Sequence, residues 1–182
     1  MKSIDDILKD RRASTLEALE VFDNLEVVSS DFMLDRWKGF EIETNHPMDG
    51  LLVPSGWYGK LFLNSEEVHP LLFYTRNKTE LYAVNPRLIP MQMKFPKTDS
   101  VGTLMKLAKP FLQTRKSTAR LRMIKYRNRV TATMCYDEKA ILDHFAKIDN
   151  NRVIGVMDLK GSPAPYIFIL ERDGDSYYKL NI

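Results

Sequence analysis

Residues 118–137 read TARLRMIKYRNRVTATMCYD, with two runs of alternating residues on either side of Asn128. Branched and aromatic side chains are typical of strands, and Asn is typical of tight turns. The stretch therefore predicts a β-hairpin with strands at 118–127 and 129–137. In the second strand, alternation puts one set of side chains on one face, Ala132, Met134 and Tyr136, and another set on the opposite face, Thr131, Thr133, Cys135 and Asp137.

Similar short runs follow and precede this hairpin. Residues 141–148 and 152–160 flank the turn cluster Asp149-Asn150-Asn151, and residues 166–172 and 177–182 flank Asp173-Gly174, a strong hairpin signal. Earlier strands are predicted at 57–63, 70–75 and 79–84. Many short strands joined by tight turns predict an antiparallel sandwich or barrel.

The N-terminal segment predicts helices instead. Ser3 with Asp6, and Ser14 with Glu17, have the form of capping boxes at helix starts. Residues 32–37 predict a further helical turn that ends at Gly39. Both faces of the later strands carry apolar residues, so we expect one face to line a barrel and the helices to cover the other.

The chain is read as one domain, 1–182, because neither half has enough strands to enclose a core. A helical segment, 1–38, precedes a first β part, 39–93. A basic linker, 94–117, contains a helix that Asp99 begins and Pro110 ends or kinks, and a second β part follows, 118–182.

Composition sets the class of protein. The chain has 44% hydrophobic and 28% charged residues, which is ordinary for a globular protein. A single cysteine excludes an internal disulfide and favours a reducing compartment. No apolar run approaches the ~18 residues of a membrane helix, and the start carries acids where a signal peptide is apolar. We therefore expect a cytoplasmic protein without a membrane segment, as a monomer or a homodimer.

Charge is distributed unevenly along the chain. Residues 94–129 hold eleven Lys or Arg and one acid, whereas the net charge of the whole chain is only +3. Such a segment attracts phosphates, but a solvated strand face is an alternative interpretation. Single-stranded nucleic-acid sites also interleave aromatics with the charge, and here only Tyr126 does so. A small anionic ligand is therefore favoured over nucleic acid as the partner.

A small closed barrel has an interior wide enough for side chains or for one small ligand. Polar residues among apolar strand residues are candidates for the wall of such a cavity. The candidate ligand-binding residues are Trp57, Lys60, His69, Arg122, Tyr126, Tyr136, Asp143 and Asp158. The alternative for each is a strand end that reaches solvent or a core group satisfied by backbone.

An acid–base pair is the second functional hypothesis. His46 and Asp49 lie three residues apart, and a carboxylate can fix the tautomer of an imidazole that moves a proton. His144 is the third candidate catalytic residue, and a structural turn is the alternative for 46–49. No histidine pair has zinc spacing and the single cysteine has no second thiol, so no metal site is predicted. No motif identifies a cofactor.

Several stretches together resemble a known family. LDRWKG at 34–39, HPMDGLL at 46–52 and SGWYGK at 55–60 resemble the GXWXG protein family, as do VHPLL at 68–72 and AVNP at 83–86. The second half is similar to the companion domain of unknown function that follows it, at 119–123, 132–134, 136–137, 141–145 and 155–161. The resemblance runs from about residue 16 to about residue 172. Asp35 stands where the name-giving motif has its first glycine.

The resemblance implies no particular activity. A looser similarity in fold exists to lipocalin-like barrels, in which a tryptophan near the first strand closes one barrel end. We therefore predict an α+β fold, with N-terminal helices packed on an antiparallel lipocalin-like β-barrel. The leading functional hypothesis is binding of a small, largely apolar ligand, with or without an anionic group. The alternative is a lyase, isomerase or hydratase that uses a His/carboxylate pair in the same cavity.

Overall fold

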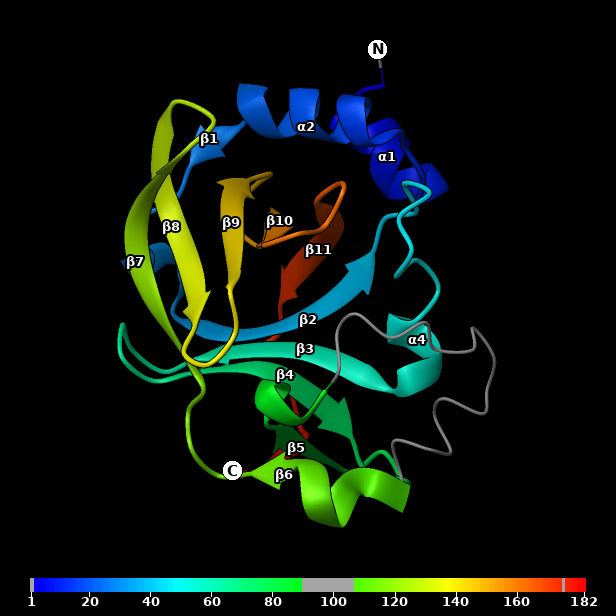
Figure 1. Cartoon of the computed structure of the whole chain (residues 1–182), viewed down its shortest axis with the longest axis vertical. Helices are drawn as coiled ribbons and strands as arrows, with labels where there is room; N and C mark the ends of the chain where they lie inside the picture. The colour runs from blue at the N-terminus through cyan, green and yellow to red at the C-terminus, as the bar shows by residue number, and fades with distance from the viewer. Residues whose placement is uncertain (1, 90–106, 175) are drawn as a thin grey trace.

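A computed structural model describes residues 2–89, 107–174 and 176–182. Among these, eight antiparallel strands form a sheet that closes on itself, in the order β4-β3-β2-β11-β10-β9-β8-β7 and back to β4 (Figure 1). The predicted antiparallel barrel with a few helices is therefore confirmed. The bounds of its strands are β2 Asp35–Glu41, β3 Trp57–Phe62, β4 Val68–Tyr74, β7 Ala119–Tyr126, β8 Arg129–Tyr136, β9 Ile141–Lys147, β10 Arg152–Leu159 and β11 Tyr166–Arg172.

The barrel closes through a short contact between β4 and β7. Val68 pairs with Ala119, and the Thr118 N–H donates to the Val68 carbonyl over 3.2 Å. The Leu121 N–H donates to the Ser65 carbonyl over 2.8 Å. Beyond this point β4 turns away to pair with β5 (Glu80–Val84), so this seam is short, whereas β2 and β11 join the two halves of the chain along five residue pairs on the other side.

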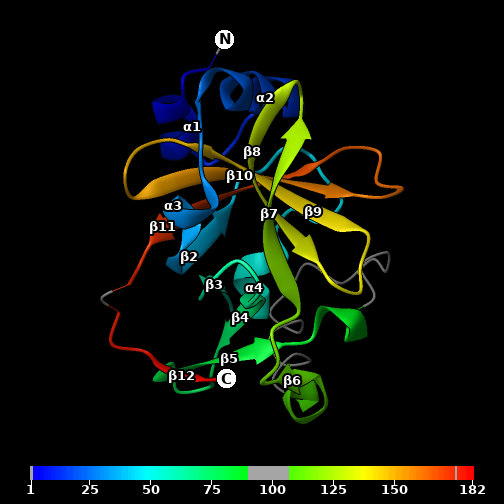
Figure 2. The ribbon, with the colours of Figure 1, turned by 90° about the vertical axis from the view of Figure 1, so that its left-hand side faces the viewer.

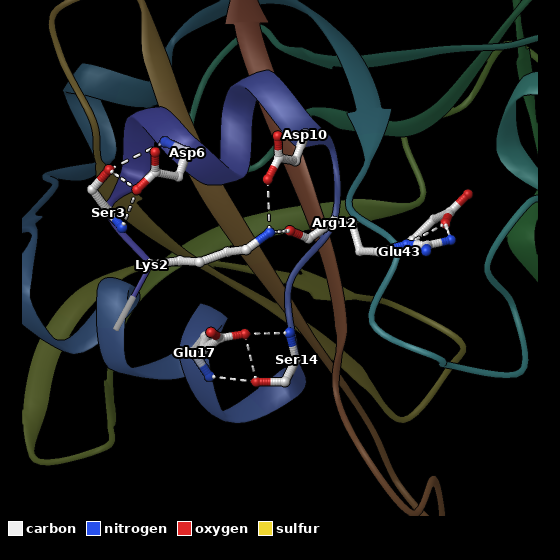
Figure 3. Close-up of polar contacts among 8 residues, drawn as sticks. All are labelled: Lys2, Ser3, Asp6, Asp10, Arg12, Ser14, Glu17 and Glu43. Atoms are coloured by element: carbon white, nitrogen blue, oxygen red, sulfur yellow. Dashed lines mark hydrogen bonds and ion pairs between the residues drawn. The ribbon is translucent and has the colours of Figure 1, made fainter.

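The N-terminal helices begin as their capping signals predict. Helix α1 (Ile4–Asp10) has the Ser3–Asp6 capping box and α2 (Thr15–Asn24) has the Ser14–Glu17 box, both visible in Figure 3. Their apolar residues pack on the outward-facing residues of β10 and β11, in a cluster that includes Ile7, Phe22, Ile154, Val156, Ile167 and Ile169. The outer face of this side of the barrel is consequently apolar because helices cover it.

The predicted helical turn at 32–37 is wrong in its second half. Helix α3 (Ser30–Met33), capped by Ser29, follows the two-residue strand β1 (Glu26–Val27) and ends before β2. Trp37 lies in β2, fully buried, and its indole N–H donates to the Met33 carbonyl over 2.8 Å. Hydrogen bonding to β3 and β11 on its two sides stabilises β2 as a strand, which local helical signals could not reveal.

The predicted hairpin around Asp173-Gly174 is also wrong. Strand β12 (Lys179–Asn181) pairs in parallel with β5, because β2 already occupies the free edge of β11. The guanidinium of Arg36 holds the connecting segment by donating to four backbone carbonyls, those of Asp173, Gly174, Ser176 and Tyr178. Strand β6 (Gln113–Thr114) extends the same edge of β5, and Figure 2 shows this group at the end of the molecule opposite α1 and α2.

The linker is only partly described. Its predicted start at Asp99 lies outside the described residues, whereas residues 107–112 are helical and continue through Pro110. The short helix α4 (Leu52–Ser55) and the 3-10 helix η1 (Pro86–Leu88) lie in the first β part. Among the described residues, no helix is both long enough and apolar enough to cross a membrane.

A β-bulge in β3 determines which of its side chains face inward. Trp57 and Phe62 belong to the interior cluster, whereas Tyr58 and Leu61 belong to an outer one. The register with β4 shifts on both sides of Gly59, whose φ is +153°. The shift changes the parity of the strand, so Lys60 faces the interior together with Trp57 although they are three residues apart.

We expect Gly59→Ala to destabilise the fold by about 3 kcal/mol or more, since a Cβ there would lie 2.0 Å from the Trp37 carbonyl oxygen, on backbone that L residues rarely adopt. Gly161→Ala is the matched control. Its φ is also positive, at +86°, but a Cβ meets no atom within 4 Å, so about 1–2 kcal/mol is expected. Urea unfolding of both variants checks this; equal losses would contradict it.

Candidate functional site

A small pocket lies inside the barrel, beneath α4 and the loop before it. Its volume is about 50 Å³, and its walls are Met48, Leu52, Trp57, Lys60, Leu71, Tyr136, Asp143, Met157, Tyr166 and Phe168. Lys60 and Asp143 are the charged residues of this wall, from β3 and β9. Lys60 Nζ lies 2.8 Å from Asp143 Oδ2, and the two side chains are only 3% and 1% exposed. The pocket therefore contains a buried ion pair.

Aromatic rings surround the ammonium group of Lys60. Nζ lies 5.0 Å from the ring centroid of Phe168 and 5.8 Å from those of Trp57 and Tyr136. A cation within about 6 Å of a ring centroid is attracted by the ring quadrupole. Nζ also donates to the Pro70 carbonyl over 3.3 Å. The Lys60 amine is thus enclosed by three aromatic rings, one backbone carbonyl and the Asp143 carboxylate.

Two polar atoms of this pocket lack a hydrogen-bond partner within the described part of the chain. They are Trp57 Nε1 and Asp143 Oδ1, and both are buried; Asp143 Oδ2 also has no such partner but is ion-paired with Lys60. Burial raises the pKa of Asp143, and the neighbouring Lys60 opposes that rise. Burial also raises the pKa of the Tyr136 hydroxyl well above its ordinary value. A donor and an acceptor consequently remain available to a guest, because buried polar atoms are normally hydrogen-bonded.

A wider depression lies on the other side of Tyr136. It measures about 450 Å³ and is lined by Tyr136, Lys139, Ala140, Ile141, Leu142, Asp158 and Lys160. Tyr136 lines both hollows, and Lys139, Asp158 and Lys160 are the charged residues of the wider one.

The loop containing His46 and Asp49 forms a hydrogen-bonded turn over the pocket. Asp49 Oδ2 accepts the backbone N–H groups of Thr44 and His46, over 2.8 and 2.9 Å. The imidazole Nδ1 of His46 accepts the Met48 N–H over 3.1 Å, and Nε2 lies 3.3 Å from Ser162 Oγ. Both ring nitrogens therefore contact groups other than the Asp49 carboxylate, which organises the turn through backbone.

Glu41 attaches the same loop to the barrel. Its carboxylate accepts the Gly50 N–H over 3.0 Å and a hydrogen bond from the Tyr166 hydroxyl. Burial raises the pKa of Glu41, and burial together with that carboxylate raises the pKa of Tyr166. Since Tyr166 lines the pocket, this contact fixes one pocket wall relative to the loop above it.

The structure brings four predicted binding residues together, Trp57, Lys60, Tyr136 and Asp143. Three others lie away from them. His69 pairs with Leu61 on the outer face of β4, where burial lowers its pKa. Arg122 lies on the surface in an ion pair of 2.9 Å with Glu66. Asp158 lines the wider depression instead.

Tyr126 and His144 form a separate cluster on the outer face. Their rings stack with centroids 3.8 Å apart at 5°, and His144 Nδ1 lies 2.9 Å from Thr133 Oγ1. His144 is 1% exposed, and its Nε2 has no hydrogen-bond partner among the described residues. Burial lowers its pKa to about 4. His144 is therefore not placed to act with the carboxylate in the pocket.

Acidic residues elsewhere in the protein pair with much of the basic segment. Arg127 lies 2.6 Å from Asp23, and Arg120 lies 2.8 Å from Asp137. Arg129 donates to backbone carbonyls at the end of α2. The positive charge that is concentrated in the sequence is thus partly neutralised in the fold.

The sequence did not single out several pocket residues, notably Met48, Leu52, Leu71, Met157, Tyr166 and Phe168. Alternation along β10 could have indicated Met157, because it places Met157 on the same face as Val153 and Gly155. Met157 and Val153 both belong to the interior cluster. The sequence gives no comparable indication for the loop residues Met48 and Leu52, because a hydrogen-bonded turn has no periodic pattern of apolar residues.

Comparisons with known proteins agree with this architecture. Residues 20–78 match the family model described as GXWXG protein, and residues 117–172 match the one described as Domain of unknown function (DUF4334). The chain thus joins a GXWXG segment to a DUF4334 segment in the predicted order, and the resemblance inferred from the sequence is confirmed. No curated protein matches the chain.

A solved structure has the same fold. The crystal structure of a protein from Thermomonospora curvata is 27% identical and superposes with a TM-score of 0.71. The match covers 93% of this chain and 95% of that one. At this similarity the comparison supports the barrel fold and assigns no activity.

We expect the Lys60–Asp143 pair to contribute little to net stability. Asp143→Leu leaves a buried ammonium without a counter-ion and should lower the free energy of unfolding by about 3–5 kcal/mol. Replacing both, as Lys60→Met with Asp143→Leu, removes both charges and should come within about 1 kcal/mol of the native chain. Urea unfolding of the single and double variants measures this. A double variant no more stable than the single ones would show that the fold itself needs the pair.

We expect acid to destabilise the outer cluster. The pKa of His144 is about 4 in the folded protein, against about 6.5 when unfolded, so protons bind the unfolded chain more readily. Stability is therefore full above about pH 6.5 and falls by about 2–3 kcal/mol towards pH 4. His144→Phe, which keeps a ring against Tyr126, should flatten this slope. Tyr126→Phe retains the imidazole and should keep the native dependence of stability on pH. Equal pH dependence in the two variants would contradict the assignment of the effect to His144.

Proposed function

We propose that this protein binds a small, largely apolar molecule inside its barrel and places an oxygen-bearing head group against Lys60, Asp143 and Trp57. One observation carries the proposal: a buried ion pair faces a pocket in which an indole N–H and a carboxylate oxygen have no partner among the described residues. The rest of the wall is mainly aromatic and aliphatic, which suits an apolar body.

The energetics support a guest. Desolvating two charges costs several kcal/mol for each ion, and a well-packed apolar pair is often as stable. Each buried polar atom without a partner costs about 1–3 kcal/mol more. A carbonyl or hydroxyl oxygen would accept from Trp57 Nε1–H and Lys60 Nζ, and a hydroxyl would also donate to Asp143 Oδ1. A bound guest would thereby supply the hydrogen bonds that these buried polar atoms otherwise lack.

The volume limits the size of the guest. An engineered cavity of about 150 Å³ holds benzene, so the 50 Å³ pocket suits a fragment clearly smaller than benzene. A longer molecule would need Tyr136 to turn aside, which would join the pocket to the 450 Å³ depression beyond it. Lys139 and Lys160 on that outer surface would favour a negatively charged end there.

The charge balance favours a neutral head group inside. Lys60 and Asp143 already neutralise each other, so a carboxylate would bring an uncompensated negative charge into an apolar site. Asp143 would have to take up a proton to admit it. A neutral oxygen needs no such change, and this places an anionic group, if the ligand has one, at the outer end.

The geometry gives less support to the enzymatic alternative. That hypothesis requires a histidine and a carboxylate within hydrogen-bond reach in one pocket. The ring nitrogens of His46 contact Met48 and Ser162, and His144 lies on the outer face with Thr133. Binding is accordingly the function that the described contacts favour.

Fluorine NMR tests the proposal directly. Labelling with 5-fluorotryptophan gives two signals, for Trp37 and Trp57, because the chain has two tryptophans. Titration with 1-propanol or acetone should shift the Trp57 signal and leave that of Trp37, which is bonded to Met33, as an internal control. Trp37→Phe assigns the two signals.

The double variant Lys60→Met with Asp143→Leu should lose the response to these probes at least ten-fold in affinity. Propionate should bind more weakly than 1-propanol at neutral pH and gain affinity as the pH falls. Native mass spectrometry of protein purified from its host should also detect a retained small molecule. No shift of Trp57 at millimolar probe and no retained molecule would refute the proposal.

A further inference from the structure

We propose that Lys60 is a carbonyl-capturing residue: its Nζ condenses with a short aldehyde in the pocket to form an imine. This inference deepens the proposed function and rests on it, since it names the chemical class of ligand that the pocket takes. Three observations carry it, namely an amine enclosed by aromatic rings, a carboxylate beside it as proton acceptor, and a pocket of a few atoms' volume.

The proton acceptor is placed for the first step. A lysine amine attacks a carbonyl only when it is neutral, so the ammonium must first release a proton. Asp143 Oδ2 lies 2.8 Å from Nζ, and transfer of the proton to it converts a buried ion pair into two neutral groups. A neutral pair is less costly than charges in an apolar enclosure, so burial assists the transfer.

The remaining steps balance without any further reactant. The neutral Nζ forms a bond to the aldehyde carbon while the C=O π-bond breaks, and one proton then passes from the nitrogen to the resulting alkoxide oxygen, giving a neutral carbinolamine. The carbinolamine oxygen takes a proton from Asp143 and leaves as water, and the nitrogen lone pair forms the C=N bond. An ammonium and an aldehyde thus yield an iminium and one water, and Asp143 is again a carboxylate.

An aldehyde leaves the net charge of the Lys60–Asp143 pair unchanged, whereas a carboxylate ligand would add a negative charge. The iminium keeps the positive charge on the same nitrogen, so its attraction to Asp143 and to the rings of Phe168, Trp57 and Tyr136 persists. Trp57 Nε1–H is a donor without a partner in the described chain and can bind the departing oxygen. The apolar wall limits access of water, which favours the imine over its hydrolysis.

The volume sets the length of the aldehyde. After condensation the carbonyl carbon lies at Nζ, so only the alkyl part must fit in about 50 Å³. An ethyl group, the alkyl part of propanal, has about two carbons and matches this space. An aromatic aldehyde such as benzaldehyde does not, unless Tyr136 moves.

Borohydride trapping tests the inference on the native chain. The protein is equilibrated with propanal and then reduced with sodium borohydride, which converts an imine into a stable propylamine. Peptide mass spectrometry locates the added propyl group. We expect Lys60 to be half-labelled at a propanal concentration at least ten-fold below that for the exposed Lys9 and Lys38. An excess of 1-propanol should protect Lys60 and leave the surface lysines unaffected.

Selectivity provides a second readout. Benzaldehyde should label Lys60 at least ten-fold less than propanal does, relative to Lys38, since only Lys60 is enclosed. In Lys60→Arg, whose folding is checked by circular dichroism, labelling should fall to the surface pattern. Labelling of Lys60 no faster than Lys38, or unprotected by 1-propanol, would overturn the inference. The Trp57 fluorine signal then tells the two ideas apart: a shift with 1-propanol leaves the binding function standing, and its absence refutes both.

Discussion

The bulge at Gly59 is the constraint on which the pocket depends. A regular strand would turn Lys60 outward if Trp57 faced inward, because their separation of three residues reverses the face. The extra residue of the bulge returns Lys60 to the inner face. That residue must be glycine, since any Cβ would collide with the Trp37 carbonyl of β2. The same small backbone feature thus packs β3 closely on β2, presents an ammonium to the barrel interior, and leaves Tyr58 to pack on the outer face.

The family motif has a related physical meaning. Trp37 is fully buried in the interior cluster and hydrogen-bonded to the Met33 carbonyl, and the guanidinium of Arg172 lies 4.3 Å from its ring centroid. Two residues on, a Cβ on Gly39 would meet the Trp57 ring at 2.2 Å, so the glycine makes room for the indole that borders the pocket. Asp35, in place of the motif's first glycine, forms an ion pair of 3.0 Å with Arg172. The motif therefore supplies one buried aromatic residue of the barrel interior and the space for another, Trp57, that borders the pocket.

The sequence predicted elements better than their connections. Alternation assigned the correct companions to each face of β8, because this strand keeps a regular pleat over eight residues. It failed at β2, where Ser and Asp caps led into an expected helical turn but pairing on both sides imposed a strand. It failed again after β11, since a tight-turn signal says nothing about an edge that another strand already occupies. Such long-range pairing is decided by strands far away in the sequence.

The same limit explains why only part of the candidate site was predicted. Tyr136 and Asp143 lie on the inner face, whereas Tyr126 and His144 lie on the outer face of neighbouring strands. The two faces have similar composition, because α1 and α2 make the outer one apolar too, so no count of hydrophobic residues separates them. What distinguishes them is how their polar groups are satisfied. His144 stacks on a neighbouring ring and meets a threonine of the protein itself, whereas Asp143 faces an ammonium across a space with room for a guest. That difference depends on the closed barrel, and it is the reason we propose the pocket, rather than the histidines, as the binding site.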